Sequence, residues 1–258
     1  MGRIFKNRRD RLKHITEMVE QEGFLSTKTL CEEFNLSPMT IARDFQYLCQ
    51  HDSRFEKIYG GIKNTGNKTS LEKFFIRWDE HKVEKEKIAQ CASSLFRSGD
   101  RIFLAPGTTT FFIAQEICKR NDLFIITNSL PIACLLPDKT QMVVFFIGGS
   151  LIPGELDTHN FQNEALLKNL DINKAVLGTW GIDCYNGITT VHPEGMNQMI
   201  IRNSEKTFIV ADHTKFGVIA PFKVADIDII DTVITSDLSP NSEIKAIQER
   251  GISVITTK

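Results

Sequence analysis

The sequence predicts an α/β protein in which a small helical unit precedes a large unit built around a largely parallel sheet. Its 258 residues, 41% of them hydrophobic, are enough for one large domain and one small domain. Apolar residues follow a helical period before residue 59, whereas short runs rich in Ile, Val and Phe alternate with helical stretches after residue 100. Residues 59–70 (YGGIKNTGNKTS) have the composition of a linker. We therefore predict an N-terminal domain over residues 1–65 and a second domain over residues 66–258, which begins with a linker at residues 66–80.

Three helices are predicted in the N-terminal domain. The first covers Arg8–Glu22, whose apolar side chains form one stripe, and the second covers Thr27–Phe34 after an N-cap at Ser26. Ser37 followed by Pro38 is a strong helix-start signal, because serine caps the first N–H groups and proline fits the first helical position. The third helix should run to about residue 50.

Two short helices joined by a tight turn form a helix-turn-helix, which places its second helix in the major groove of DNA. The segments Arg54–Ile58 and Gly61–Lys63 would form the hairpin of a winged variant. The alternative is a three-helix module that binds other proteins. The candidate DNA contacts are Met39, Thr40 and Arg43 near the bases, Ser37 at the helix start, and Arg8 and Arg9 near the phosphates.

The large domain is predicted to begin with an amphipathic helix over Lys82–Phe96, with Val83, Ile88, Ala92 and Leu95 on its apolar side. Seven apolar runs then suit buried strands: Arg101–Ala105, Leu123–Thr127, Met142–Ile147, Ala175–Thr179, Thr207–Ala211, Thr232–Thr235 and Ser253–Thr257. Helical stretches separate these runs, which favours parallel pairing.

The strongest local ligand signal is the segment Ala105–Thr110 (APGTTT), which precedes a predicted helix over Phe111–Lys119. A strand, a glycine turn, hydroxyl groups and a helix start place backbone N–H groups beside the positive end of the helix dipole, which suits a phosphate or a carboxylate. The alternative is that Thr108 only caps the helix. The segment is not a GxxxxGK[ST] loop, which disfavours nucleotide hydrolysis.

Polar or glycine residues also follow three other predicted strands. They are Asn128 and Ser129, Gly148 and Gly149, and the segment Asp212–Lys215. Because ligands in open α/β sheets bind at the carboxyl ends of the strands, these loops should converge with the first. The candidate ligand contacts are Gly107, Thr108, Thr109, Thr110, Asn128, Ser129, Gly148, Gly149 and Lys215. They include no Lys–Ser or Cys–His pair, so they fit binding better than nucleophilic catalysis.

The composition argues against several classes of protein. The formal net charge is −1, so no overall excess of charge indicates nucleic acid or membrane, although six of the first thirteen residues are basic. No apolar run reaches the roughly 18–20 residues of a membrane span, and the charged N-terminus argues against a signal peptide. The six cysteines form no CxxC pair and have no histidine at ligand spacing. We therefore expect reduced, buried thiols, no metal, no cofactor and a cytoplasmic location.

The segment LSPMTIARDFQYLCQHDSRFEKIYGGIK resembles the DNA-binding region of DeoR-type transcriptional regulators, whose pattern is roughly Val-Ser-x-x-Thr-Ile-Arg-Arg-Asp-Leu followed by a wing ending in His-Gly-Gly. The matching residues are Ser37, Thr40, Ile41, Arg43, Asp44, Gly60 and Gly61. Ala42 replaces one of two adjacent arginines, and Tyr59 replaces the histidine. The resemblance continues in family order through APGTTT (105–110), TNSLPIA (127–133), IGGSL (147–151), GTWGID (178–183) and ADHTKFG (211–217), and so covers nearly the whole chain.

This resemblance implies a DNA-binding transcriptional regulator, and a repressor rather than an activator, of genes for sugar metabolism. It implies a second domain that senses a phosphorylated sugar or sugar derivative, with a fold similar to ribose-5-phosphate isomerase and CoA-transferase-like domains. The resemblance also implies that the chain binds operator DNA as a homo-oligomer, because two symmetric half-sites raise the affinity of a two-fold protein.

Two residues depart from the family pattern in the second domain. Ala105 stands where the family commonly has aspartate, and Gln198 stands near a usual lysine, four residues after Glu194, which the resemblance adds to the effector contacts. With these departures, the second domain could bind a less charged or larger ligand, or could have lost the ability to sense a ligand. The competing hypothesis is a sugar-phosphate isomerase-like enzyme with a helical N-terminal extension. Isomerisation needs a positioned base, and these two departures remove two candidates, so we expect no enzymatic activity.

Overall fold

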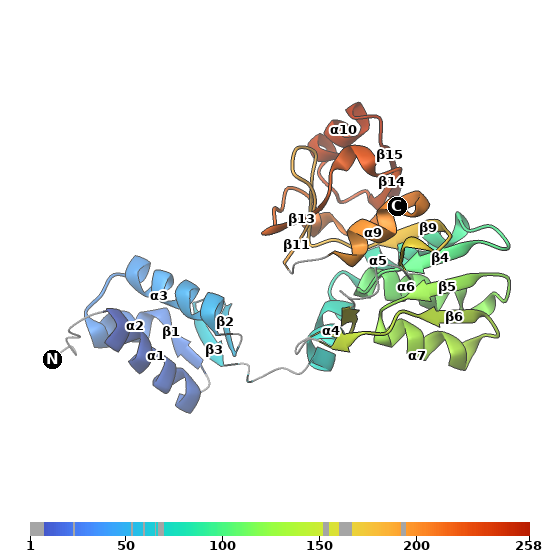
Figure 1. Ribbon diagram of the computed structural model, residues 1–258. Coiled ribbons are helices and arrows are strands. Elements are labelled where there is room, and N and C mark those ends of the chain that lie inside the picture. Colours follow the sequence, from blue (N-terminus) through green and yellow to red (C-terminus); the bar gives the residue numbers. More distant parts are fainter. Residues whose placement is uncertain are drawn as a thin grey trace. The chain divides into compact units, whose positions relative to one another are not determined.

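The computed structural model describes the chain apart from residues 1–7, 23, 53, 59, 65, 67–69, 152–154, 160–166 and 192–194. The chain divides into two compact units, residues 1–69 and residues 70–258 (Figure 1). The division lies close to the predicted one, but the predicted linker extended to residue 80. Residues 70–79 instead form a helix of the second unit.

The first unit combines helices with a small antiparallel sheet. Its described elements are α1 (Arg8–Glu22), β1 (Phe24–Ser26), α2 (Thr27–Phe34), α3 (Pro38–His51), β2 (Phe55–Ile58) and β3 (Gly61–Asn64). The strand order is β1-β3-β2, so the hairpin that follows α3 is extended by the strand that precedes α2. The predicted helices and the predicted hairpin are confirmed. Strand β1 was not predicted, because three residues are too few to show a period.

An apolar core holds the first unit together. The side chains that are completely buried in it include Ile15, Val19, Leu30, Ile41 and Ile62. Helix α2 ends at Asn35, whose φ of 52° is left-handed, a conformation that asparagine tolerates better than most residues. Gly61 is required where β3 pairs with β1, because a Cβ at this position would lie 2.3 Å from the carbonyl oxygen of Leu25.

A seven-stranded sheet forms the centre of the second unit. Its strands are β4 (Arg101–Leu104), β5 (Phe124–Thr127), β6 (Val143–Phe146), β9 (Ile172–Leu177), β12 (Ser204–Val210), β14 (Thr232–Ser236) and β15 (Ser253–Thr257). All neighbouring pairs are parallel, in the order β15-β14-β12-β9-β4-β5-β6. Each strand overlaps a predicted one, so the predicted α/β class is confirmed. The strand order reverses between β4 and β9, which is the switch point where open α/β sheets bind ligands.

The two faces of this sheet are covered differently (Figure 1). Ile102 and Leu104 of β4 face the helices α5 (Lys82–Ser94), α6 (Thr108–Glu116) and α7 (Leu130–Lys139). Phe103, between them in sequence, faces the opposite layer. That layer contains α9 (Met196–Arg202), α10 (Asn241–Glu249) and an antiparallel sheet of β10 (Gly181–Asp183), β11 (Gly187–Thr190) and β13 (Phe222–Ala225). The small sheet was not predicted.

Helix α4 (Ser70–Asp79) is the main difference from the predicted organisation. The glycine- and asparagine-rich composition of the linker ends before it, and its aromatic side chains pack on α6. Phe74 is buried and meets the ring of Phe111 edge-on at 5.4 Å, and Trp78 stacks on Phe112 at 5.7 Å. These contacts hold α4 against the second unit.

Two further expectations need correction. Val83 was placed on the buried side of the helix now defined as α5, but its side chain is 64% exposed. The buried face of α5 is turned so that it begins with Glu84 and Lys85, two ionisable residues that a hydrophobic pattern does not select. The six cysteines are free thiols, as expected, but only Cys184 is buried and Cys134 is exposed.

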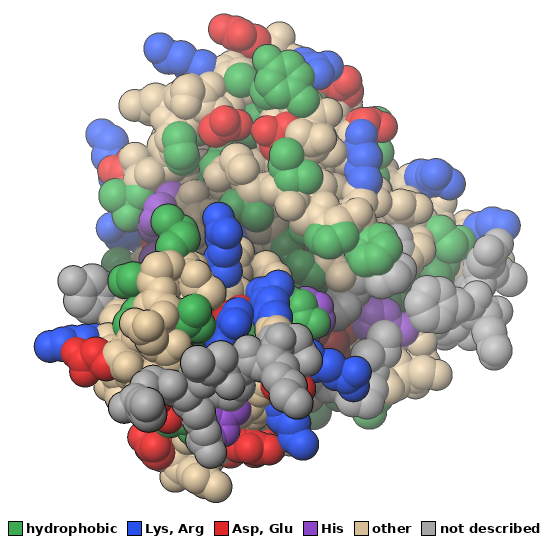
Figure 2. Space-filling model, turned by 90° about the vertical axis from the view of Figure 1, so that its left-hand side faces the viewer, with side chains coloured by type: hydrophobic (Ala, Val, Ile, Leu, Met, Phe, Trp, Pro, Cys, Tyr) green, Lys and Arg blue, Asp and Glu red, His purple; other side chains and the backbone are tan. Residues whose placement is uncertain are grey.

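Two surface properties bear on function. Among the described residues, no helix is long and apolar enough to cross a membrane. On the face of the molecule drawn in Figure 2, basic and acidic side chains are mixed, in keeping with the net charge of −1.

Candidate functional site

Helix α3 begins with the predicted cap. The Ser37 Oγ accepts a hydrogen bond from the backbone N–H of Thr40 at 3.3 Å, and it lies 3.0 Å from the Thr40 hydroxyl. Pro38 occupies the first helical position. The cap fixes the first turn of α3, so the side chains of that turn project in a defined direction.

The exposed face of α3 carries side chains suited to DNA. Arg43 is exposed, and the Met39 side chain is 65% exposed. An arginine pairs with guanine in the major groove, and an apolar side chain contacts the thymine methyl group. Thr40 is half-buried, and its hydroxyl lies beside the Ser37 hydroxyl that caps the helix.

Two arginines of α1 are tied to α3 through a buried carboxylate. Arg8 Nε lies 2.9 Å from one Asp44 oxygen and Arg11 Nε lies 2.6 Å from the other, and the Asp44 side chain is 1% exposed. The Arg8 guanidinium also lies 4.9 Å from the centre of the Tyr47 ring. Arg8, predicted as a phosphate contact, is therefore engaged in holding α1 on α3, whereas Arg9 is exposed on α1.

Arg54 fixes the start of the hairpin. Its guanidinium forms a two-pronged ion pair with Asp52 and donates to Glu20 of α1 at 2.6 Å. The Arg54 hydrogen bonds hold the pKa of the Asp52 carboxyl below its ordinary value. Strand β2 exposes Glu56, Lys57 and Ile58, and Tyr59, which replaces the histidine of the family pattern, lies outside the described residues.

A pocket of about 400 Å³ opens at the carboxyl ends of β4, β5, β9 and β12 in the second unit. This is the predicted convergence of loops, and it lies around the switch point of the sheet. The predicted contacts that line the pocket are Gly107, Thr108, Thr109, Asn128, Ser129 and Lys215. Ala105, where the family pattern has aspartate, also lines it.

The other predicted contacts do not line the pocket or lie outside the described residues. The Thr110 hydroxyl donates to the Gly107 carbonyl at 3.0 Å, and its side chain is fully buried. Gly148 and Gly149 follow β6, the edge strand, which lies two positions from β4 and so further from the switch point. Glu194 is outside the described residues.

The start of α6 presents backbone donors to the pocket. Gly107 is the N-cap residue, with φ at 148°, and no side chain caps the helix. Thr108 is the first helical residue, so the alternative in which it acts only as the cap is wrong. A side chain at position 107 would be strained, which accounts for glycine there. The uncapped N–H groups and the helix dipole favour an anion at this point.

Acceptor groups line the pocket beside this helix start. Asn128 is 2% exposed and donates through Nδ2 to the Thr158 carbonyl at 3.0 Å, whereas its Oδ1 has no hydrogen-bond partner among the described residues. Asp157 pairs with Ser129 as an isolated β-bridge and brings a carboxylate to the pocket. Buried polar atoms in proteins are almost always paired, so the Asn128 oxygen is a candidate acceptor for a donor group in the pocket.

Three cations, Arg77, Lys85 and Lys215, also line the pocket. Lys85 is 3% exposed, and its ammonium donates to the carbonyls of Arg77 and Glu80, the latter at 2.6 Å. Burial lowers the pKa of Lys85, and the charge of Asp212 opposes that effect. Lys215 Nζ and the Arg77 guanidinium each lie 5.8 Å from the centre of the same indole ring, that of Trp180.

The contributions of α4 and α5 to this pocket were not predicted from the sequence. Arg77 and Lys85 precede the first strand of the sheet, so no rule about strand ends selects them. Trp180 follows β9 in the GTWGID segment, and its place after a strand was a signal that went unused. Asp157 lies in an irregular segment without a periodic pattern.

Comparisons with known proteins agree with this architecture. The family model described as "DeoR-like helix-turn-helix domain" matches residues 11–66, and that described as "DeoR C terminal sensor domain" matches residues 80–237. The glycerol-3-phosphate regulon repressor of Escherichia coli is 27% identical over 93% of this chain and 95% of its own length. The lactose phosphotransferase system repressor of Staphylococcus aureus is 31% identical over 82% of this chain and 85% of its own.

Among solved structures, ribose 5-phosphate isomerase A of Methanocaldococcus jannaschii is similar over 53% of this chain and 55% of its own, with 16% identity and a TM-score of 0.39. The two family models match in the order of the two units and together span most of the chain. The chain therefore belongs to the DeoR family of helix-turn-helix transcriptional regulators.

Proposed function

We propose that this regulator is a repressor of genes for carbohydrate metabolism that binds operator DNA through α3 and the β2–β3 hairpin and responds to a phosphorylated, sugar-like effector. One observation carries the proposal: a capped, exposed recognition helix occurs in the same chain as a pocket that combines a bare helix N-terminus, cations and an unpaired buried acceptor. The names of the two curated relatives, both repressors, support this function.

In this proposal Arg43, Thr40 and Met39 approach base edges. Ser37 fixes the start of the helix, and Arg9 lies near a phosphate. Arg8 acts by holding α1 against α3 through Asp44, because its guanidinium is already engaged there. Ala42 replaces the second of two arginines in the family pattern, so we expect fewer phosphate contacts than in relatives that have both.

The effector is proposed to lie with its anionic group on the start of α6. Gly107 and Thr108 supply backbone N–H groups there, and Lys215 supplies a positive charge. Lys85 uses two donors on carbonyls, and an ammonium has three, so a third is available to the ligand. Hydroxyl groups of the effector would donate to Asn128 Oδ1 and to Asp157, whose carboxylate compensates for the one absent at Ala105.

A thermal-shift screen of the full chain tests this pocket. The probes are inorganic phosphate, pentose and hexose phosphates and triose phosphates, each sugar phosphate beside its unphosphorylated counterpart. A ligand at 100 times its Kd should raise the free energy of unfolding by about 2.7 kcal/mol. Stabilisation by phosphorylated compounds alone supports the proposal, and equal stabilisation by both members of each pair contradicts it.

We also propose that the pocket binds its ligand without chemical turnover. Abstraction of a proton beside a carbonyl needs a positioned base, and Ala105 and Gln198 replace two candidate groups of the family pattern. Gln198 instead donates to the Lys223 carbonyl at 3.2 Å. The purified protein should show no isomerase activity on pentose or hexose phosphates above background. Turnover that disappears in an Asp212→Asn variant would favour the enzyme hypothesis, because this carboxylate also lines the pocket.

The active species is proposed to be a homo-oligomer in the cytoplasm. A two-fold operator binds two recognition helices at once, which raises the effective affinity without new contacts. Light scattering coupled to gel filtration should give a mass at least twice that of one chain. A monomer that binds a palindromic operator with full affinity would contradict this expectation.

A further inference from the structure

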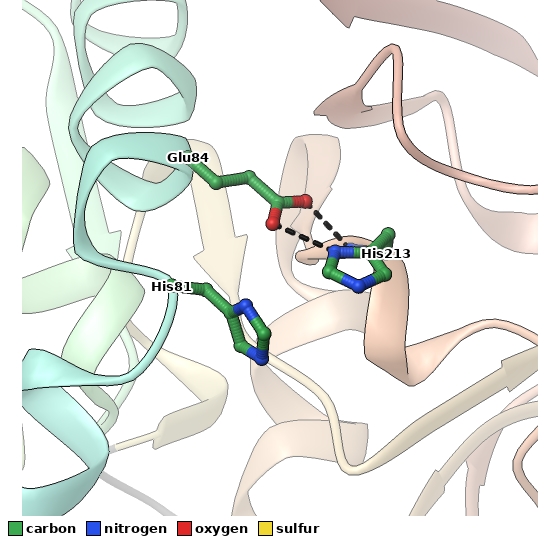
Figure 3. Close-up of side chains that lie close together, drawn as sticks. All are labelled: His81, Glu84 and His213. Atoms are coloured by element: carbon green, nitrogen blue, oxygen red, sulfur yellow. Dashed lines mark hydrogen bonds and ion pairs between the residues drawn. The ribbon is translucent and has the colours of Figure 1, made fainter.

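Three side chains with metal-binding donors meet at the rim of the pocket, apart from the effector contacts described above. They are His81 and Glu84 at the start of α5 and His213 of the 3-10 helix His213–Lys215, which follows β12 (Figure 3). One donor atom from each lies within 4.8 Å of the other two. His81 also lines the pocket, so the cluster is open to a bound ion.

Glu84 orients His213. One oxygen of the Glu84 carboxylate lies 2.8 Å from His213 Nδ1, and the other accepts the His213 backbone N–H at 2.7 Å and the hydroxyl of Ser236. When the neutral ring donates from Nδ1 to the carboxylate, its lone pair is on Nε2, where it can bind a metal ion. A carboxylate that holds one ring nitrogen of a histidine is the usual support of a metal-binding imidazole.

His81 completes the cluster from the other side. Its ring meets that of His213 nearly edge-on, with the ring centres 4.8 Å apart and an interplanar angle of 82°. Figure 3 shows both rings beside the Glu84 carboxylate. The backbone of His81 is left-handed, with φ at 52°, and non-glycine residues in that region are uncommon and concentrate at functional sites.

The charge of Glu84 also favours a cation. Its side chain is 5% exposed, and it is hydrogen-bonded to the backbone N–H of His213, the His213 ring and the Ser236 hydroxyl. A buried carboxylate is costly unless positive charge lies close to it. A divalent ion between the imidazoles would provide that charge.

We propose that His81 and His213 bind a divalent transition-metal ion of the zinc class, and that Glu84 supports His213. His213 binds through Nε2, His81 binds through its ring, and Glu84 is the positioning carboxylate. Imidazole and carboxylate suit Zn²⁺ and Co²⁺ better than they suit Mg²⁺ or Ca²⁺, which prefer oxygen ligands. Two protein ligands leave positions for water or for an oxygen atom of a molecule in the pocket, so the ion gives this regulator a second input.

The sequence did not indicate this site. His81 and His213 are separated by more than one hundred residues, and no histidine stands at ligand spacing from a cysteine. The fold brings them together because α5 packs beside the carboxyl end of β12, where the bond between Glu84 and His213 joins the two elements.

Metal binding to the full chain tests the proposal directly and does not depend on the effector or on DNA. Chelator-treated protein, kept reduced, is titrated with Zn²⁺ by calorimetry, and the visible spectrum of the Co²⁺ form reports the ligands. We expect one ion per chain. His81→Gln and His213→Gln should each weaken binding at least about tenfold, and Glu84→Gln should weaken it about 10–100-fold, the usual effect of removing a supporting carboxylate.

Two variants serve as controls. His51→Gln removes an exposed histidine of the first unit, and Cys134→Ser removes the exposed thiol. Both should bind Zn²⁺ as the unaltered chain does. His81 is exposed, so the fold of His81→Gln is expected to persist, and its tryptophan emission without metal checks this. The proposal is wrong if the unaltered chain takes up no stoichiometric Zn²⁺, if His81→Gln binds it equally well, or if Cys134→Ser abolishes binding.

Discussion

One buried polar site in each unit shows a difference in how its hydrogen-bonding atoms are paired. In the first unit, the buried carboxylate of Asp44 is satisfied on both oxygens by Arg8 and Arg11. In the second unit, Asn128 Oδ1 and Arg77 Nε are buried at the pocket and have no hydrogen-bond partner among the described residues. The Asp44 carboxylate is thus paired on both oxygens within the chain, whereas these two atoms at the pocket have no such pairing within the described part of the chain.

This difference fits the two tasks of the family. A recognition helix must keep one orientation, so the ion pairs that hold it should contribute to the unfolding free energy of the first unit. Ligand binding must lower the free energy of the pocket. A buried acceptor that is unpaired without ligand costs about 1–3 kcal/mol, and a ligand that pairs it removes this cost and so binds more tightly. Substitutions in the two units should therefore change different observables.

The largest effect is expected from Asp44→Ala. Removing the carboxylate leaves Arg11, whose side chain is 15% exposed, without its partner, and should destabilise the first unit by about 3 kcal/mol. Both tryptophans, Trp78 and Trp180, lie in the second unit. Urea unfolding should therefore show an earlier transition by far-UV circular dichroism, while the tryptophan transition is unchanged.

The control for this substitution is Glu17→Ala. Glu17 lies on α1 with its side chain 52% exposed, so the loss of its charge should change stability very little. A shift of the tryptophan transition in Asp44→Ala, or equal effects of the two substitutions, would show that the two units do not differ as described.

The next effect concerns the pocket. Lys215→Ala and Thr108→Val should each weaken binding of the effector found in the thermal-shift screen, the lysine by about 1.5–3 kcal/mol because its partner is charged. Neither should change operator affinity without effector. Trp180 lines the pocket, so its emission can follow the titration. A bound effector that never changes operator affinity, or variants that respond like the unaltered chain, would mean that the effector site lies elsewhere.

The same contrast explains how much was predictable. The start of α3 could be predicted from Ser37 and Pro38, because capping depends only on neighbouring residues. Seven apolar runs predicted the seven strands, because strands buried on both faces have a continuous apolar pattern. The loops after β4, β5 and β12 were expected at the pocket because each follows a strand, but the same rule also selected Gly148 and Gly149 after β6, which do not line it. Arg77, Lys85 and the histidine cluster were not predictable, because α4 and α5 reach the pocket by packing that leaves no pattern in the sequence.

An effect of about 1–3 kcal/mol is expected on DNA binding from Arg43→Ala, if Arg43 pairs with a base. Lys13→Ala is the control, because it removes the same charge from an α1 side chain that is 80% exposed. Operator and unrelated DNA are compared at several salt concentrations. Arg43→Ala should lower the preference for operator, whereas a uniform loss on both DNAs, with a shallower salt dependence, would assign Arg43 to a phosphate.

The smallest effect is the acid response of one ion pair in each unit. Burial alone would raise the pKa of Asp100 in the second unit, but the hydrogen bond from Lys174 and the backbone N–H of Arg97 outweigh it, so the pKa is lowered. In the first unit, Arg54 lowers the pKa of Asp52. The unfolded chain then binds more protons, so each carboxylate contributes stability above its unfolded pKa of about 4 and loses that contribution as the pH falls.

The two pairs should respond differently to salt. The Asp100 and Lys174 side chains are each 11% exposed, whereas those of Asp52 and Arg54 are 28% and 35% exposed. Exposed pairs are screened more strongly by salt than buried pairs. The difference in unfolding free energy between the unaltered chain and Asp100→Asn, followed by tryptophan emission, should shrink from pH 6 to pH 3 and change little with salt. The difference for Asp52→Asn, followed by circular dichroism, should also shrink with acid but fall at high salt, and equal salt responses would mean that the two pairs are screened alike.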